Sequence, residues 1–589
     1  MDYSLLVEAY QRIDSTTKRL EITDHLVDLF KKTPVELIDK VVYLTQGKLY
    51  PDYMGIELGI AEKLAVKAVA MAAGVSEHKV DRTVKELGDL GETAAKFMGK
   101  RAQATLFQEA LTVEKVYDGL DRIARAAGEG AQDLKIKILS GLLSNASPDE
   151  AKYLVRTVTG RLRLGVADMT ILDALALAFC GSKDLRPILE RAYNLSSDLG
   201  GVAKAVAERG VEGVKGFKVT VGKPIRPMLA ERLPSAEEIL AKIGGKGLAE
   251  YKYDGERLQI HKLANGEVMI FSRRLENITH HYPDVCELAR KYVKADEAIL
   301  EAEGVAINPD SGEMLPFQEL MHRRRKYGIE EAMEQYPIAL FCFDLLYADG
   351  EDYTLKPLPQ RRRKLEKVIK RSERVQLSQA MVASDVEELE KFFEKAIEDG
   401  CEGVVVKSIG DDSVYQAGAR GWLWIKYKRD YKSVLTDTVD LVAVGAFHGR
   451  GKRAGTYGAL LMAAYDKQND LFKTVCKVGT GFTDEDLAKL PKLFKDNVLP
   501  HRHARVESQI EADVWFVPAV VLEIVGAEIT LSPIHTCAMN RIRAGSGLAI
   551  RFPRFTGRYR TDKAPEDATT VEEIVEMYLR QLKKIEAEA

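Results

Sequence analysis

Apolar residues in the first part of the chain recur at spacings of three and four, for instance at Leu26, Leu29 and Phe30. This spacing places them on one face of an α-helix. Turn signals such as Ser147-Pro148 separate one such segment from the next, and almost no segment alternates with a period of two. We therefore predict an all-helical, all-α domain over residues 1–220.

The composition changes between residues 220 and 235, where Gly222, Pro224, Pro227 and Pro234 indicate a linker. From there to about residue 429, patterns typical of strands mix with patterns typical of helices. This mixture predicts an α+β domain over residues 221–429.

Short β-rich runs separated by turns follow, at residues 439–444, 457–465, 473–478 and 520–525. About five such strands are typical of a small β-barrel. A helix that begins near Thr483 has acidic residues in its first turn and is expected to pack across the barrel. A last helix begins near Thr570, with Glu573 at capping-box spacing. These elements predict a C-terminal β-barrel domain over residues 430–589.

The composition is that of a globular protein, with 46% hydrophobic and 30% charged residues among 589. The net charge of −3 gives no global signal for nucleic-acid binding, so any such contact must come from local basic runs. Basic runs occur at residues 323–326 and 361–364, and arginines are frequent in 541–560. Ordinary solvated surface is the simpler interpretation of each run.

The six cysteines are scattered without a C-x-x-C pair, which argues against a zinc site and against a disulfide framework. The N-terminus lacks the features of a signal peptide, and no apolar run approaches the ~20 residues that span a bilayer. We expect a cytoplasmic protein.

The candidate chemistry centres on a strand-like stretch at residues 249–261. Glu250, Lys252 and Asp254 alternate with apolar and aromatic residues, so these three side chains share one face. Gly255 releases the backbone, and Arg257 opens a second alternating run. A lysine on a rigid element becomes a nucleophile when a nearby cation or loss of solvent lowers its pKa. A solvated charged strand face is the alternative.

The pattern Lys-x-Asp-Gly-x-Arg, formed by Lys252, Asp254, Gly255 and Arg257, resembles the nucleotidyl-lysine motif of ATP-dependent DNA ligases, capping enzymes and RNA ligases. The resemblance implies that the Lys252 amine attacks the α-phosphorus of ATP and retains AMP. It also implies that Glu250 and Arg257 contact the nucleotide.

Further motifs of that family follow in order. Arg273 matches an arginine that grips the nucleotide and helps to arrange the DNA end, and Glu303 matches a glutamate that contacts the ribose or a metal. Phe343 matches a ring that stacks on adenine, although core packing also explains the apolar run around it. The same resemblance assigns metal binding to Glu402 and a phosphate contact to Lys407. Strict alternation puts those two on opposite faces, so Gly403 must distort the strand or Glu402 must precede it.

Lys426 and Lys428 share a face of a later strand, where an anion such as the α-phosphate would separate them. As cations they are also expected to lower the pKa of Lys252. Arg420, just upstream, matches a nucleotide-contacting arginine of the family.

The last motif includes Arg558 and Arg560, which the resemblance assigns to the pyrophosphate leaving group when the barrel closes over ATP. Thr556-Gly557 resembles a one-residue insertion, so the register of Arg558 stays open, and a basic DNA-facing strand is the alternative. Residues 449–453 resemble a phosphate loop, but Ala446 and Arg453 break the pattern. We interpret them as a DNA-facing turn.

Residues 43–51 and 160–166 resemble the DNA-binding domain of archaeal and eukaryotic replicative ligases, and Arg161 and Arg163 are candidate phosphate contacts. Residues 103–107 (Gln103-Ala104-Thr105-Leu106-Phe107) loosely resemble peptides that dock into sliding clamps; core packing is the alternative.

The resemblance covers nearly the whole chain. It implies an ATP-dependent DNA ligase that seals nicks in replication, repair and recombination, with an adenylation (nucleotidyltransferase) domain at 221–429 and an oligonucleotide-binding (OB) fold as its barrel. ATP as co-substrate, Mg²⁺ or Mn²⁺ as metal, nicked duplex DNA as partner and a monomeric state follow from it. An RNA ligase or capping-type enzyme is the alternative, which the long helical domain disfavours. A non-catalytic DNA-binding scaffold is a further alternative. It would need a pocket that has lost its functional residues, whereas Lys252, Glu402 and Lys426 are all present.

Overall fold

The computed structural model describes residues 1–100, 109–307, 314–315, 317–323, 328–428, 438–449, 455–526, 528–532, 534–551 and 553–587. Its backbone contacts separate two compact units, residues 1–77 with 94–428 and residues 78–93 with 429–589. The predicted sliding-clamp peptide at 103–107 lies outside the described residues.

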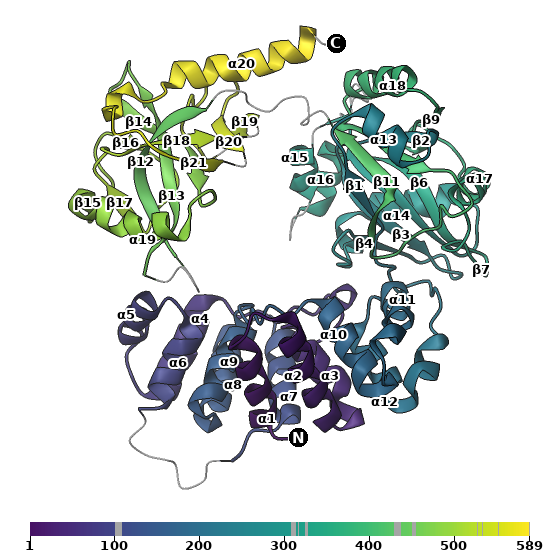
Figure 1. Ribbon diagram of the computed structural model, residues 1–589, viewed down its shortest axis with the longest axis horizontal. Helices are drawn as coiled ribbons and strands as arrows, with labels where there is room; N and C mark the ends of the chain where they lie inside the picture. Colours follow the sequence, from purple (N-terminus) through teal and green to yellow (C-terminus); the bar gives the residue numbers. More distant parts are fainter. Residues whose placement is uncertain are drawn as a thin grey trace. The chain divides into compact units, whose positions relative to one another are not determined.

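The N-terminal part is helical, as its three-and-four spacing predicts, and α9 begins with a capping box between Ser147 and Glu150 around Pro148. Its helices (Figure 1) are α1 (Tyr3–Asp14), α2 (Arg19–Lys32), α3 (Ile38–Thr45), α4 (Glu62–Ala73), α5 (Glu77–Leu87), α6 (Leu90–Met98), α7 (Val113–Arg125), α8 (Ala131–Asn145), α9 (Pro148–Val158), α10 (Asp168–Leu175), α11 (Arg186–Ser196) and α12 (Leu199–Lys215).

The central part contains two sheets. The first has the order β1-β11-β10-β2-β9 and is made of β1 (Leu229–Arg232), β2 (Gly247–Lys252), β9 (Ala380–Ala383), β10 (Gly403–Ser408) and β11 (Arg420–Lys428). Helices α13 (Ala236–Lys242) and α18 (Val386–Glu398) pack against it.

The second sheet has the order β4-β3-β5-β6-β7, with β8 also paired to β6. Its strands are β3 (Glu256–Lys262), β4 (Val268–Ser272), β5 (Ala298–Ala306), β6 (Ile338–Ala348), β7 (Glu351–Asp352) and β8 (Val375–Leu377). Helices α14 (Pro283–Tyr292) and α17 (Leu358–Val368) bury their apolar faces in the core of this sheet. The remaining helices of this part are α15 (Phe317–Leu320) and α16 (Ile329–Gln335).

The C-terminal part is a sheet domain with the strand order β15-β17-β12-β13-β14-β16, in which β18 pairs with both β12 and β21. The strands are β12 (Val439–His448), β13 (Tyr457–Asp466), β14 (Leu471–Val478), β15 (Val498–Leu499), β16 (Val506–Glu507), β17 (Val514–Phe516), β18 (Val521–Val525) and β21 (Arg554–Tyr559), with β19 (Glu528–Ser532) and β20 (Gly547–Arg551) as a separate pair. Helices α19 (Asp484–Leu493) and α20 (Val571–Ala587) begin where predicted. Thr570 and Glu573 make the expected reciprocal cap.

One arginine in each of two basic runs is buried, unlike the solvated surface that the sequence suggests. Arg323 is fully buried against Asp284, 2.5 Å away, and Arg361 is fully buried against Asp344. A buried guanidinium needs a carboxylate partner, and the sequence pattern does not reveal such a partner in advance.

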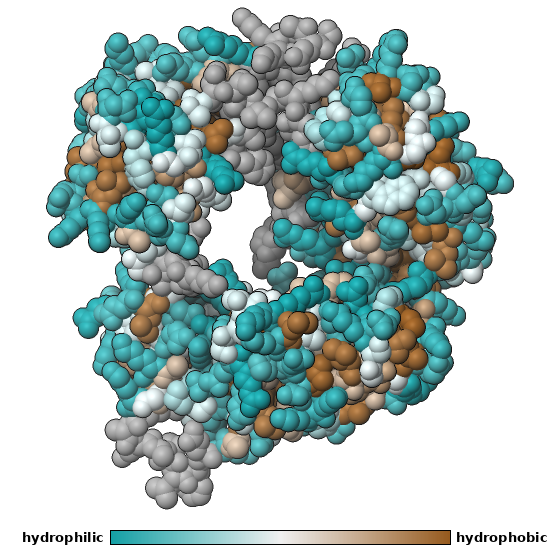
Figure 2. Space-filling model, viewed as in Figure 1, coloured by the Kyte–Doolittle hydropathy of each residue, from teal (hydrophilic) through white to brown (hydrophobic). Residues whose placement is uncertain are grey.

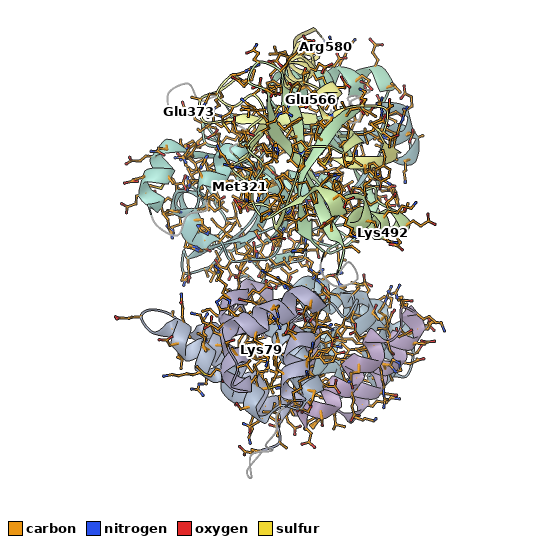
Figure 3. All side chains as sticks on the ribbon, turned by 90° about the vertical axis from the view of Figure 1, so that its left-hand side faces the viewer. Lys79, Met321, Glu373, Lys492, Glu566 and Arg580 are labelled. Carbon is orange, nitrogen blue, oxygen red and sulfur yellow. The ribbon has the colours of Figure 1, made fainter. Side chains whose placement is uncertain are left out.

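The visible face in Figure 2 is mostly hydrophilic with scattered hydrophobic patches, and Figure 3 shows Met321, 40% exposed, among the side chains of the first unit.

All six cysteines are described and all are free thiols. In the described part of the chain, no helix is both long enough and apolar enough to cross a membrane.

Candidate active site

Strand pairing places the predicted nucleophile beside the two predicted phosphate-binding lysines. In the first sheet, Lys252 on β2 lies opposite Gly403 on β10, which lies opposite Lys428 on β11. One step along, Glu250 and Lys426 lie opposite the same β10 residue in the same way. Residues directly opposite in neighbouring strands share a face. The sheet therefore presents Glu250, Lys252, Lys426 and Lys428 on one surface.

Glu402 reaches this surface because it precedes β10. The strand begins at Gly403, whose φ is +141°, a conformation that side-chain-bearing residues rarely adopt. The Glu402 amide donates to the Lys252 carbonyl at 2.8 Å. The condition that alternation imposed on Glu402 is met in this way.

The electrostatics of Lys252 differ from the prediction. Burial lowers its pKa, but the carboxylates of Glu402, Glu303 and Asp254 outweigh burial, so the pKa of Lys252 is raised. Its Nζ forms an ion pair with Glu402, and the same carboxylate oxygen lies 2.6 Å from Lys428 Nζ. The expectation that neighbouring cations lower the pKa of Lys252 is wrong, because the attraction of these three carboxylates raises it.

Lys426 shows the opposite behaviour. Its pKa is lowered by burial, and then by the positive charges of Lys428, Lys252, Arg420 and Arg273. Within the described part of the chain, no carboxylate lies within ion-pair distance of Lys426. A cation surrounded by cations is a natural place for a phosphate.

Three carboxyl groups, those of Asp254, Glu303 and Glu402, interact with Lys252. Glu303 on β5 lies opposite Arg257 on β3. Burial raises the pKa of Glu303 to about 7; Glu402 and Asp254 add to the rise, while Lys252 and Arg257 oppose it. Crowded oxygen donors of this kind suit Mg²⁺. The described residues contain no ready-made group of three metal ligands, but Mg²⁺ that is also bound by substrate phosphates needs only one or two protein carboxylates.

Aromatic rings form the next part of the site. The Arg257 guanidinium lies 5.4 Å from the ring centroid of Phe343 and 5.5 Å from that of Trp424. Lys407 Nζ lies 4.8 Å and 4.4 Å from the same two rings. Phe343 therefore lies near two cations and is only partly buried; its stacking on adenine stays a prediction.

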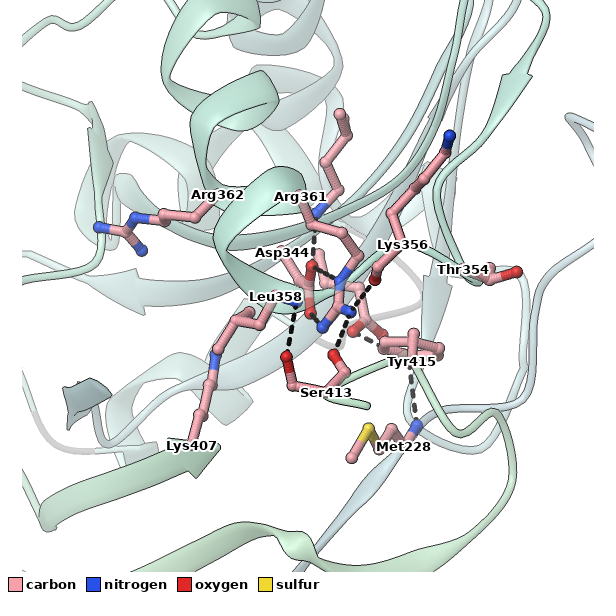
Figure 4. Close-up of polar contacts among 12 residues, drawn as sticks. Met228, Asp344, Thr354, Lys356, Leu358, Arg361, Arg362, Lys407, Ser413 and Tyr415 are labelled. Atoms are coloured by element: carbon pink, nitrogen blue, oxygen red, sulfur yellow. Dashed lines mark hydrogen bonds and ion pairs between the residues drawn. The ribbon is translucent and has the colours of Figure 1, made fainter. Parts of the chain in front are cut away.

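Lys407 is buried and its Nζ lies 2.6 Å from Glu250. Arg362 on α17 donates to the other Glu250 oxygen at 3.0 Å. Both cations neutralise Glu250, and Figure 4 shows Arg362 on helix α17 and Lys407 on strand β10. The phosphate contact assigned to Lys407 stays a prediction; its partner in the structure is Glu250.

Arg273 and Arg420 act on Lys426 through their charges, whereas Arg161 and Arg163 lie in the helical part. Arg273 and Arg420 are exposed. In the helical part, Arg161 is paired with Glu62 at 2.6 Å, whereas Arg163 is exposed with a φ of +39°.

The two arginines of the last motif differ in their surroundings. Arg558 is 64% exposed and lies 3.6 Å from Glu523. Arg560 is bonded to Asp440 at 2.6 Å and to Asp562 at 2.7 Å. β21 carries a bulge between Phe555 and Tyr559 relative to β18, at the place of the apparent insertion, and the bulge includes Arg558.

Sequence reasoning missed several residues of the site. Tyr415 bonds to Glu301 and Arg257, and Arg362 bonds to Glu250. Gln259 and His261 are buried polar residues on β3. Their alternation with Leu258 and Ile260 was visible in the sequence, but the groups they bind are remote in the chain.

A lysine amine set among carboxylates and further lysines, in a two-sheet domain that follows a helical domain, defines a multidomain protein of the lysine-dependent nucleotidyltransferase class. Residues 227–428 match the ATP dependent DNA ligase domain, residues 2–176 the DNA ligase N terminus, and residues 453–563 the ATP dependent DNA ligase C terminal region.

Full-length relatives agree with these matches. The chain is 61% identical to DNA ligase 2 of Thermofilum pendens, over 99% of this chain and 98% of that protein. It is 56% identical to the DNA ligase of Staphylothermus marinus, over 99% and 100%. A solved chain named Pmar-Lig_Pre. shares the fold, with a TM-score of 0.55 at 16% identity over 94% of this chain and 99% of that one. The chain belongs to the ATP-dependent DNA ligase family.

Proposed function

We propose that this protein is an ATP-dependent DNA ligase that seals nicks in duplex DNA through AMP carried on Lys252. The observation that carries the assignment is the register Lys252–Gly403–Lys428 beside Glu250–Val405–Lys426. It presents one amine as nucleophile and two as an anion site on a single rigid face.

In the first step, Lys252 Nζ forms a bond to the α-phosphorus, and the bond from that phosphorus to the β-phosphate oxygen breaks. Pyrophosphate leaves with the electron pair. The amine must first lose a proton, and Glu402, already in contact with it, is in place to accept that proton. Lys426 and Lys428 neutralise the phosphate charge, which is the main requirement of phosphoryl-type transfer.

The AMP then passes to the 5′-phosphate at a nick, and the 3′-hydroxyl attacks that phosphate and releases AMP. Bound Mg²⁺ would neutralise phosphate charge in these steps; Glu303 and Glu402 are the residues that would hold it. Arg273 and Arg420 are exposed cations near Lys426; both are proposed to contact the nucleotide, and Arg273 also to arrange the DNA end. Arg163 is a further exposed cation, in the helical domain.

The C-terminal sheet domain is proposed to be an OB fold that brings Arg558 to the pyrophosphate. Arg560 is engaged by two aspartates, so Arg558 is the more available of the two. Because binding to duplex DNA uses mainly backbone phosphates, affinity for nicked DNA should fall with salt.

The test is incubation of the wild type, Lys252→Ala and Lys246→Ala with ATP labelled at the α-phosphate, followed by nicked DNA. Lys246 is an exposed lysine outside the site, so its variant controls for loss of a lysine. We expect a covalent adduct in the wild type and in Lys246→Ala only, stable to alkali and cleaved by acid as a phosphoramidate P–N bond is, and its loss as sealed DNA forms. Equal labelling of Lys252→Ala would overturn the assignment. Sealing of an RNA nick in preference to DNA would favour the RNA ligase alternative.

A further inference from the structure

Three alternate side chains of β3 bind the backbone of the linker that enters the central domain. His261 Nδ1 accepts a hydrogen bond from the Gly222 amide at 3.0 Å. Gln259 accepts from the Ile225 amide at 2.7 Å and donates to the Ile225 carbonyl at 2.9 Å. Arg257 donates to the Met228 carbonyl at 2.7 Å. The linker is thus held at every third residue by one face of a single strand.

The same segment is part of the core rather than a loose connection. Ile225 and Met228 are fully buried and pack in one apolar cluster with Tyr415 and Trp424. The Met228 amide donates to the Tyr415 hydroxyl at 2.9 Å, which closes the far side of the contact (Figure 4). The backbone of Met228 is therefore bonded at both its amide and its carbonyl.

Arg257 connects this linker contact to the nucleotide pocket. Its guanidinium has five N–H donors, and four of them are assigned. Two bond to Glu301, at 3.2 Å and 2.7 Å, one to Met228, and one to the Tyr415 hydroxyl at 3.2 Å. The Arg257 group is consequently fixed beside the Phe343 and Trp424 rings, which meet edge to face at a centroid distance of 6.2 Å, with one N–H of Nη1 left over.

The hydrogen-bond donors and acceptors of His261 and Gln259, on the same strand as Arg257, pair without conflict. Since His261 Nδ1 is an acceptor, its Nε2 carries the hydrogen and donates to Gln259 at 2.9 Å. Burial lowers the pKa of His261 to about 3, so the ring is neutral near pH 7 and holds this tautomer. Gln259 also donates to Glu301 at 3.4 Å.

We propose that Gln259, His261 and Tyr415 are positioning residues for ATP binding, which act through Arg257. They hold linker residues 222–228 against β3, and the held linker fixes Arg257 beside the Phe343–Trp424 ring pair, against which the nucleoside rests. This inference rests on the proposed adenylation of Lys252. It makes the linker from the helical domain a component of the nucleotide site, so that linker docking and ATP binding favour each other reciprocally.

The test compares Tyr415→Phe and Gln259→Met with the wild type and with Tyr353→Phe. Tyr353 is a matched control, because this buried tyrosine donates its hydroxyl to Glu351 at 2.7 Å and, among the described residues, makes no hydrogen bond to linker residues 222–228. Single-turnover labelling of Lys252 at varied ATP concentration gives a half-saturating ATP concentration and a limiting rate. Amide hydrogen exchange follows Gly222, Ile225 and Met228 in the same proteins.

Loss of one partner of a buried hydrogen bond corresponds to about a 10-fold change in an equilibrium constant. We expect Tyr415→Phe and Gln259→Met to raise the half-saturating ATP concentration about 10-fold, with a limiting rate within about twofold of wild type, and to speed exchange of the three linker amides. In the wild type, adenylation should slow that exchange. Tyr353→Phe should change neither quantity.

Two results would overturn the inference: half-saturating ATP concentrations within about twofold of wild type in both variants, or a raised value without faster linker exchange, as a merely structural loss would give. These outcomes are distinct from failure of the proposed function, which would show as a wild type that is not labelled on Lys252 at all.

Discussion

Replacing Arg361 with Met should unfold the central domain at a much lower temperature. Arg361 and Asp344 are both completely buried, and the guanidinium donates to the two carboxylate oxygens at 2.8 Å and 3.0 Å. It also donates to the carbonyls of Lys356 and Ser413, each at 2.8 Å (Figure 4). Arg361 therefore joins α17, β6 and the segment that leads to Tyr415.

The magnitude follows from the charge that is left behind. Removal of one partner of a buried ion pair leaves an uncompensated charge and costs about 3–5 kcal/mol. For a domain of roughly 200 residues, each kcal/mol lowers Tm by about 2–4 °C, which gives a decrease of about 6–20 °C. The double variant Arg361→Met/Asp344→Leu buries no charge, so it should lose less than the sum of the two single variants.

The assay is thermal unfolding followed by tryptophan fluorescence in a Trp515→Phe background. The chain has three tryptophans, and the remaining two, Trp422 and Trp424, both lie on β11 of the central domain. Single-variant losses below about 1 kcal/mol, or a double variant that loses the full sum, would refute the argument from buried charge.

Two further predictions concern the site. Glu303 has a pKa of about 7 in the folded chain against an ordinary value of 4.5, so its contribution to stability is present below pH 4.5 and is lost as pH rises through 7. Glu303→Gln should therefore be more stable than wild type by up to about 3 kcal/mol at pH 8 and by little at pH 4. Urea unfolding that shows no such pH trend would contradict the prediction. A Cβ at Gly255 would lie 2.4 Å from the Gly304 carbonyl and 3.0 Å from Glu303 Cγ. Gly255→Ala should therefore lower the free energy of unfolding by about 1–3 kcal/mol and slow Lys252 labelling at least tenfold. The control Gly141→Ala has open space around the new Cβ and should lose neither stability nor activity.

The geometry at Gly255 adds a second reason for its presence. The break expected there is observed, because β2 ends at Lys252 and β3 begins at Glu256, and the closeness of β5, which carries Glu303, leaves no room for a side chain. Adjacent sequence predicts a turn residue from local conformation, but it cannot show that a strand some 50 residues later passes within contact distance.

Local pattern alone was sufficient for the helical first part, for most strand positions and for the order of the candidate site residues. Helix and strand periodicity are properties of neighbouring residues, and the side chains that chemistry requires are visible as residue types. Strand alternation also predicted that Glu402 can reach the site if it precedes the strand, and in the structure β10 begins at Gly403.

Tertiary structure alone decided the charge state of Lys252 and the partners of its neighbours. Its pKa depends on Glu402, 150 residues away in the chain, and on Glu303. Likewise, Arg361 belongs to a run that is typical of a surface, yet it is buried because Asp344 pairs with it in the folded chain. The position of Arg257 is fixed by its hydrogen bonds to Glu301, Tyr415 and Met228. Electrostatic interaction and desolvation depend on distance and burial in space, and neither quantity is contained in the order of residues along the chain.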